Sequence, residues 1–398
     1  MTTKKLPPVM GMDNTSEEFA LERSGDGAKL YVRDAVNIDF TESGRMTMRE
    51  GIALQTNLPF KYLWQSSLHH DCFAMLHGAW VKVDPITWEY EELIPQIGEG
   101  PLFHQIINNF VLMSCDTGLY TFNGLQAVKF TIDTPAKPYV SFSADGSIDA
   151  GAYSFAISWL VGERESALSE IDKIDVVQYS NLDVQFPMCL DEKVTHIRLY
   201  MTEQNGGELR QVKDYPISTT HTSLPVLPEF GRVPQFQHFS PMKHGKFLSL
   251  WRGRILCVHL NVLYFSEAMA FHLTDERYNF IQFPQRITFV EPVEGGIWVG
   301  QYDHVVFLRG ADLKELVLEH KAAAKPISDS GFTVDSAVVG ADLSQGGALS
   351  AMWLSEKGFV LGSASGQLIE LQSDHLSNIT ALSGMAVGLG NRVVAIVN

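Results

Sequence analysis

Two Asp-x-Gly triplets are the residues of this sequence best suited to catalysis. Asp116 opens an Asp-Thr-Gly triplet after an apolar strand, and Asp329 opens an Asp-Ser-Gly triplet far along the chain. Two aspartates that share one proton at close range are the catalytic pair of aspartic proteases. However, Leu119 follows the first triplet where a hydroxyl residue would brace the carboxylate, and Asp329 lies in a polar loop after Pro326. Because Asp-Thr-Gly is also a common hairpin turn, an aspartic-protease-like enzyme is the remote alternative.

A second group with chemical potential is the run His69, His70 and Asp71. Adjacent histidines on a strand point to opposite faces, so the run predicts a solvated loop rather than a metal site. The sequence also contains no P-loop, no G-x-S-x-G and no G-x-G-x-x-G after a strand. We therefore predict no catalytic residue, no cofactor and no metal ligand.

Four tryptophans offer a binding alternative. Trp64, Trp80, Trp88 and Trp298 are of the residue type that lines sugar-binding platforms, but tryptophans scattered over strands more often pack in a core. Asn378 begins an Asn-Ile-Thr triplet, which accepts a glycan only in a secreted protein. A receptor- or glycan-binding function remains the alternative to a structural one.

The composition indicates the class of fold that would position such residues. The 398 residues are 45% apolar and 19% charged, which is typical of a folded protein. Thirty-two glycines and 23 phenylalanines favour an all-β protein with many tight turns. No apolar run is long enough to span a membrane, so no membrane insertion is expected. The net charge of −16 argues against tight binding of a phosphate backbone.

The termini and cysteines indicate the compartment. The N-terminal stretch has two lysines and Pro7-Pro8 but no apolar segment, so we expect no secretory signal. The cysteines are widely separated and are expected to be reduced, buried side chains: Cys72, Cys115, Cys189 and Cys257. Both features predict synthesis and assembly in a cytoplasm.

Repeated hairpins dominate the chain. Five segments each contain an apolar strand, a Gly or Asp turn and an aromatic-rich strand. The second strands are expected at 80–83, 119–122, 262–265, 305–308 and 367–370. Hairpins that recur at intervals of tens of residues are typical of β-propeller blades. The basic turn in "LWRGRIL" (250–256) is predicted to join two strands of one such blade.

A block with a different pattern interrupts the hairpins. Residues 153–161 alternate as a strand, and Asn205-Gly206-Gly207 predicts a hairpin between strands 195–202 and 209–215. Prolines bracket the block, which predicts an inserted β-sandwich of immunoglobulin or fibronectin type at 135–228. The propeller would then comprise 29–134 and 229–398, after an N-terminal arm at 1–28 that orders against a neighbouring protein.

Two further expectations concern single elements. Residues 312–323 are the best candidate for a helix, with Asp312 as its N-cap. Residues 29–40 and 391–397 are both strand-like, and we expect them to complete one shared blade that closes the ring.

The stretch 11–51 resembles the opening of a family of bacteriophage virion proteins. The shared pattern is a Gly-x-Asp-Asn start (11–14), Arg-Asp-Ala-x-Asn-x-Asp (33–39), and a Gly-Arg turn (44–45) into a basic strand that ends at Gly51. The family has a proline where Glu50 stands and more arginines around Thr47. The hairpin "WRGRI…LYFSE" (251–267) and its continuation to 300 are similar too, as are 163–166 and 197–200.

The resemblance implies a propeller with an inserted sandwich in the tail of a short-tailed phage, as a nozzle, hub or tail-tube protein. It implies a ring of identical copies, contacts with a portal adaptor and a tail fibre or spike, and DNA that passes through the lumen without specific binding. It also implies assembly in the bacterial cytoplasm and a final place in the virion. The implied function is structural and non-enzymatic.

Overall fold

The chain is built almost entirely of small antiparallel β-sheets. The computed structural model describes residues 8–23, 29–41, 43–51, 53–66, 68, 71–335, 348–389 and 392–398. Within these ranges the helical elements are two short 3-10 turns, η1 (Glu18–Ala20) and η2 (Leu313–Glu315). The predicted all-β class is confirmed.

Five sheets have the same construction of four antiparallel strands in sequence order. They are β6 (Lys61–Gln65), β7 (Cys72–Leu76), β8 (Ala79–Val83) and β9 (Tyr90–Ile94); β10 (Phe103–Ile107), β11 (Phe110–Cys115), β12 (Gly118–Phe122) and β13 (Ala127–Lys129); β23 (Lys246–Trp251), β24 (Arg254–His259), β25 (Val262–Phe265) and β27 (Phe280–Gln282); β28 (Ile287–Val293), β29 (Gly296–Gln301), β30 (Val305–Arg309) and β31 (Val317–Lys321); and β32 (Phe332–Val334), β33 (Ser350–Ser355), β34 (Gly358–Gly362) and β35 (Leu368–Glu370). Each expected second strand of the repeated hairpins is a strand of these sheets.

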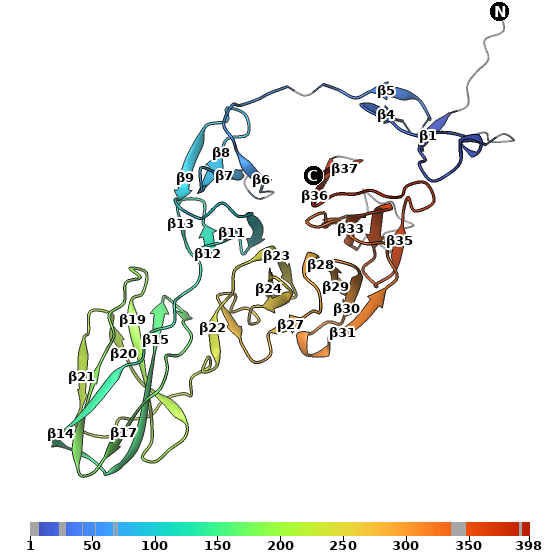
Figure 1. Ribbon diagram of the computed structural model, residues 1–398. Coiled ribbons are helices and arrows are strands. Elements are labelled where there is room, and N and C mark those ends of the chain that lie inside the picture. Colours follow the sequence, from blue (N-terminus) through green and yellow to red (C-terminus); the bar gives the residue numbers. More distant parts are fainter. Residues whose placement is uncertain are drawn as a thin grey trace, which may run out of the picture.

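The five sheets lie along an arc, and each packs on the next (Figure 1). The middle strands are apolar on both faces because each face meets a neighbouring sheet. Between the first and second sheets, Phe73 meets Phe122 edge-to-face. Between the fourth and fifth, Phe289 stacks on Trp353. In Figure 1, β6, β23 and β28 lie toward the inside of the arc, and β9, β31 and β35 lie outside.

Two further sheets interrupt the row and share one hydrophobic core. One contains β14 (Tyr139–Ile148), β18 (Ser180–Gln185) and β21 (His221–Leu224); the other contains β16 (Arg164–Glu165), β15 (Gly151–Val161), β19 (His196–Thr202) and β20 (Leu209–Pro216), with β17 (Asp172–Val176) also on β15. Phe155 and Leu199 of one sheet and Leu182 of the other are fully buried in this core. The predicted hairpin at Asn205 is confirmed, since Asn205 has φ 55° between β19 and β20. This two-sheet unit projects from the row of sheets at the lower left of Figure 1.

The expected shared sheet of 29–40 and 391–397 is wrong for the residues that the structure describes; residue 391 lies outside them. The strands pair locally instead: β1 (Val9–Met12) and β2 (Glu22–Arg23) flank β3 (Lys29–Val32), β4 (Ile38–Phe40) pairs with β5 (Met46–Met48), and β36 (Gly384–Leu389) pairs with β37 (Arg392–Val397). Short loops close at a lower entropic cost than a pairing across the whole chain. A further pair joins β22 (Phe239–Pro241) and β26 (Leu273–Asp275).

The predicted helix at 312–323 is also wrong. Asp312 does cap, because its side chain accepts the backbone N–H of Lys314, but it caps only the single turn η2. The chain then enters β31, which pairs with β30 along its whole length, from Val317 opposite Arg309 to Lys321 opposite Val305. The hydrogen bonds of this sheet edge outweigh the helical pattern of the segment.

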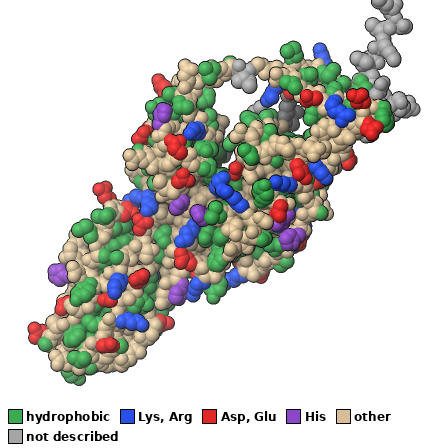
Figure 2. Space-filling model, in the orientation of Figure 1, with side chains coloured by type: hydrophobic (Ala, Val, Ile, Leu, Met, Phe, Trp, Pro, Cys, Tyr) green, Lys and Arg blue, Asp and Glu red, His purple; other side chains and the backbone are tan. Residues whose placement is uncertain are grey.

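Two other features concern the surface. Figure 2 shows acidic, basic and apolar side chains interspersed over the face in view, and an opening beneath the segment that joins β5 to β6. No helix in the described ranges is long and apolar enough to cross a bilayer. The four cysteines are unpaired, as predicted, and Cys189 is the one that is only half-buried.

Candidate functional site: the fastening points of the chain

Residues 13–15 and 374–377 form a contact that we call the terminal clasp. The Asn14 side chain donates to the Ser377 carbonyl oxygen at 3.0 Å and accepts the Ser377 N–H at 2.9 Å. The Asn14 N–H donates to the His375 carbonyl at 2.9 Å, and the Thr15 hydroxyl donates to the Asp374 carbonyl at 2.8 Å. An amide side chain that both donates to and accepts from one residue imitates a strand partner. The clasp therefore fastens the N-terminal segment beside the fifth sheet.

Asp13 organises the clasp from a buried position. Its carboxylate accepts the N–H groups of Thr15 at 3.0 Å and Ser16 at 2.9 Å, and it lies 3.1 Å from His375 Nδ1. Burial by itself raises the pKa of Asp13, but these hydrogen bonds and the Ser16 hydroxyl outweigh it and hold the pKa well below its usual range. The His375 ring also stacks on Tyr31 at 4.6 Å. The described part of the predicted arm, residues 8–23, thus contacts its own chain, and ordering on a neighbouring protein stays a prediction.

The basic turn between β23 and β24 is a second fastening point. Arg252 and Gly253 have φ of 47° and 73°, the backbone of a tight hairpin turn. The Arg252 guanidinium donates to the Glu294 carbonyl oxygen at 2.6 Å, which ties the third sheet to the fourth. The Arg254 guanidinium donates to the Ser266 carbonyl at 2.8 Å and lies 3.6 Å from Glu267. The prediction of a turn within one sheet is confirmed, and its arginines bind backbone carbonyls.

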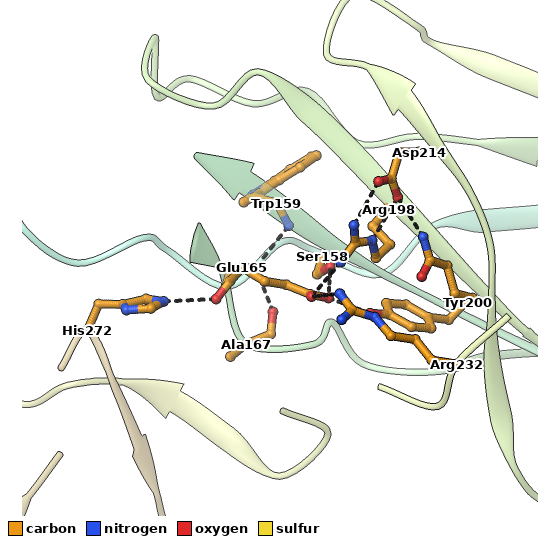
Figure 3. Close-up of polar contacts among 11 residues, drawn as sticks. Ser158, Trp159, Glu165, Ala167, Arg198, Tyr200, Asp214, Arg232 and His272 are labelled. Carbon is orange, nitrogen blue, oxygen red and sulfur yellow. Dashed lines mark hydrogen bonds and ion pairs between the residues drawn. The ribbon is translucent and has the colours of Figure 1, made fainter. Parts of the chain in front are cut away.

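The two-sheet unit contains a buried polar cluster around Glu165 (Figure 3). One carboxylate oxygen accepts the hydroxyl groups of Ser158, at 2.7 Å, and of Tyr200. The other accepts Arg198 at 2.8 Å, and Arg198 also donates twice to Asp214 at 2.7 Å. Burial and the nearby Glu165 charge raise the pKa of Tyr200. Each polar group named here thus has a hydrogen-bond partner within the cluster.

The same strand, β16, fastens the two-sheet unit to the row of sheets; we call this contact the joint. The Glu165 carbonyl oxygen lies 2.9 Å from Nε2 of the buried His272, in the loop before β26 (Figure 3). A carbonyl oxygen only accepts, so this ring nitrogen carries a proton. Burial lowers the pKa of His272, which favours the neutral ring. Arg164 adds a bond to the Phe130 carbonyl at 3.2 Å.

A cleft of about 680 Å³ opens beside the joint. Its lining combines aromatic rings with charged groups from the second sheet, the joint and the loop before β22; it includes Phe110, Phe130, Phe236, Arg232 and His272. The Arg232 guanidinium lies 3.8 Å from Glu165. A half-open pocket with convergent polar groups is the kind of site that binds small molecules or extended chains.

The two candidate catalytic aspartates have different partners. The Asp116 carboxylate accepts the Gly100 N–H at 3.0 Å, whereas Asp329 lies 3.4 Å from Lys246 Nζ. The structure therefore places each in its own contact rather than in a shared hydrogen bond. Among the described residues no group of three or more His, Cys, Asp or Glu side chains is arranged to hold a metal ion. His69 and His70 lie outside the described residues, and Asp71 pairs with Lys82 at 3.3 Å.

The four tryptophans do not form one sugar platform. Trp80 and Trp298 are 0% exposed, between sheets, so packing explains them. Trp64 is half-buried and stacks on His104 at 4.9 Å. Trp80 Nε1 donates to His104 Nε2 at 3.2 Å, and burial lowers the pKa of His104 to about 3. The neutral His104 ring is thus a structural acceptor that packs beside Trp64 and Trp80.

The sequence reasoning missed Glu165, His272 and Asn14 as fastening residues. Glu165 follows the predicted strand 153–161 in a run of three charged residues, 163–165, and nothing local distinguishes it from its exposed neighbour Glu163. His272 and Asn14 also lack a local signal, because their partners are 107 and 363 residues away.

No family model and no curated protein matches the chain. Several solved structures can be superposed over most of its length. Kluyveromyces lactis Hsv2 with loop 6CD replaced by a Gly-Ser linker gives a TM-score of 0.33 at 7% identity, over 86% of this chain and 90% of that one. BBS1N in complex with ARL6DN gives a TM-score of 0.33 at 11% identity, over 85% of this chain and 89% of that one. The complex of the fission yeast SREBP–SCAP binding domains gives a TM-score of 0.32 at 12% identity, over 92% of this chain and 97% of that one. Similarities at this level carry no argument about the arrangement of the sheets or the function.

Proposed function

We propose that the chain is a non-enzymatic structural protein of a phage tail. In this proposal the row of sheets is a β-propeller, and the two-sheet unit is an inserted sandwich of immunoglobulin or fibronectin type. Copies of the chain form a ring around the DNA exit path, in a nozzle or hub position. They contact the portal adaptor above and a fibre or spike below.

One observation supports the proposal more than the others: the motifs that resemble virion proteins supply hydrogen bonds that hold segments of the chain together. The Gly-x-Asp-Asn start supplies Asp13 and Asn14 of the terminal clasp. The Gly-Arg-Ile hairpin supplies Arg254, which binds the carbonyl of Ser266 at the exit of its own sheet. Residues 163–166 supply the joint. Polar side chains that are fully engaged in holding distant segments together suit a component that bears load.

The mechanism that follows is mechanical and electrostatic. Sheets that pack face to face make a stiff wall, because close-packed interiors transmit strain rather than absorb it. A chain with a net charge of −16 repels a polyanion, so DNA would slide past the ring without adhering. The joint would hold the inserted unit at a fixed angle, where it meets the neighbouring tail protein.

The composition of purified particles tests this proposal. The chain should be present in intact particles at a fixed number of copies, a multiple of one ring, and it should remain with the tail after the DNA has been released. A protein that is abundant in infected cells but absent from washed particles would overturn the proposal.

The cleft beside the joint favours receptor or glycan binding as the second candidate. Its aromatic and charged lining has the composition of a binding site. Binding of a host-surface glycan by the purified chain, lost in Phe236→Ala and retained in Phe19→Ala, an exposed aromatic outside the cleft, would support this candidate. No binding to host envelopes at high protein concentration would remove it. The protease alternative predicts acid peptide cleavage that Asp116→Asn abolishes.

A further inference from the structure

Two hairpins of the described chain lack the strands that every blade-like sheet has. The five sheets of the row each have four strands, whereas β4–β5 and β36–β37 are sheets of two. An isolated two-stranded hairpin is marginally stable in water, and three or more strands or a packing partner are needed. Together the two hairpins contain four strands, as many as each sheet of the row.

The β36–β37 hairpin begins such a sheet. Val393 of β37 packs against Val334, Met352 and Leu361 on the fifth sheet, the same face-to-face relation that joins the other sheets. Its other face is apolar and exposed: Met385 lies opposite Ile396, and Val387 opposite Val394, with Ile396 73% and Val387 57% exposed. In an uninterrupted row, this face would meet another sheet.

The β4–β5 hairpin is held away from β36–β37 within its own chain. The Val9 N–H donates to the Gly44 carbonyl in the turn between β4 and β5, so the hairpin is attached to the N-terminal sheet. The terminal clasp fastens that segment to residues 374–377. In Figure 1, β4 and β5 lie outside the arc, whereas β36 and β37 lie inside it. The hairpin therefore projects toward solvent.

The surface of β4–β5 fits a second copy of this chain. Val36, Ile38, Met46 and Met48 are exposed, Met48 at 87%, so the hairpin has apolar side chains to bury. Arg45 and Arg49 flank β5 and are exposed, which makes this strand a basic edge on a chain of net charge −16. A second copy offers an acidic field and, in β36–β37, a two-stranded sheet whose apolar face β4 and β5 would extend.

We propose that the β4–β5 hairpin of one copy adds to the β36–β37 hairpin of the next and completes a four-stranded sheet between subunits. Backbone pairing along free strand edges would supply the affinity, and the apolar side chains would set the register. Two different patches that recognise each other make a head-to-tail contact, and such contacts generate rings when the rotation closes. The inference rests on the proposed ring and names its interface.

Disulfide trapping between two differently tagged chains tests the interface. One chain carries Met48→Cys on β5 and the other carries Val387→Cys on β36, and they are mixed under oxidation at raised salt, which screens the repulsion between acidic chains. The matched control replaces Met48→Cys by Ile86→Cys, an equally exposed apolar position at the β8–β9 turn. We expect the hetero-disulfide to exceed the control several-fold. Equal yields in the two mixtures would overturn the interface.

A double variant separates exchange between copies from closure within one chain. In dilute Met48→Cys/Val387→Cys protein the two thiols should remain unlinked, since the clasp holds the hairpin outside the arc. A rapid disulfide within single chains would overturn the exchange between copies. The unmodified chain should sediment mainly as a monomer at micromolar concentration and low salt and associate as salt rises, and Met48→Glu should weaken that association.

These outcomes are independent of the test of function. A chain found in phage tails without the trapped disulfide would retain the proposed function and lose this interface. A trapped disulfide in a chain absent from particles would retain the interface as a self-association site and lose the proposed function.

Discussion

The side chain of Asn14 pairs with the backbone of Ser377 in both directions, donating at 3.0 Å to its carbonyl oxygen and accepting its N–H at 2.9 Å. This pairing joins two parts of the chain that share no strand ladder among the described residues. The expected closure by a shared sheet is replaced, in the described residues, by side chains of the clasp.

Replacing Asn14 by Ala should release the N-terminal segment. The variant leaves both backbone groups of the half-buried Ser377 without this partner, and each lost hydrogen bond costs about 0.5–1.5 kcal/mol. We expect a lower Tm and faster proteolysis within residues 8–33. Gln55→Ala, in the exposed connection before β6, is the matched control. Identical melting and cleavage of the two variants would show that the clasp carries no load.

Acid should open the clasp through Asp13. Its folded pKa lies below the ordinary value of 3.8, so its contribution to stability is fully present above that value and is lost as the pH falls below it. Asp13→Asn removes the charge at every pH. Denaturant unfolding should show a variant that is less stable than the parent at pH 7, with a difference that shrinks below about pH 4. A difference that stays constant down to acid pH would contradict this role.

His104 should make the first two sheets sensitive to milder acid. Burial lowers its pKa from 6.5 to about 3, so the folded state favours the neutral ring, and stability is lost as the pH falls from 6.5 toward 3. His104→Gln keeps an acceptor for Trp80 Nε1 and does not titrate. Tryptophan fluorescence during unfolding should show a smaller loss of stability in the variant as the pH falls from about 7.5 to about 4.5, an interval that includes the ordinary pKa of histidine. Equal losses of stability in the parent and in the variant would show that the group responsible for the acid sensitivity is not His104.

Removing Glu165 should destabilise the inserted unit severely. Glu165→Ala leaves the half-buried Arg198 with Asp214 as its remaining carboxylate partner and removes the acceptor of the Tyr200 hydroxyl. Each lost hydrogen bond to a charged group costs about 1.5–3 kcal/mol. Glu163→Ala, two residues away and exposed, should change stability little. Hydrogen exchange resolved by segment is the measurement, with faster exchange expected in β15 and β19. Unchanged exchange in these strands would show that Arg198 is held adequately by Asp214 alone.

The strands were predictable where the signal is local. Residues 153–161 alternate with period two, and Asn205 marks its turn, so these elements follow from the sequence. The helix prediction for residues 312–323 was wrong because β30 offers a full ladder of hydrogen bonds to a segment whose own pattern suits a helix. Local propensity is a weak guide where an edge strand is available.

The fastening residues were less predictable because their roles depend on distant partners. The buried Glu165 carboxylate accepts a hydrogen bond from Arg198, 33 residues away, and its backbone carbonyl accepts one from His272, 107 residues away. The pairing of Asp13 with His375 spans 362 residues. The stretches that resemble virion proteins contain Asp13 and Glu165, but the resemblance does not give their contacts, since a motif names residue types and not their partners.

Imaging of intact particles with the inserted unit labelled is the most direct test of the account. A gold-labelled antibody against residues 139–224 should decorate intact phage particles at the tail only, in a ring of discrete positions around the DNA exit path. Label on the capsid shell, or on no part of the particle while the free protein binds the antibody, would contradict the structural role in the tail.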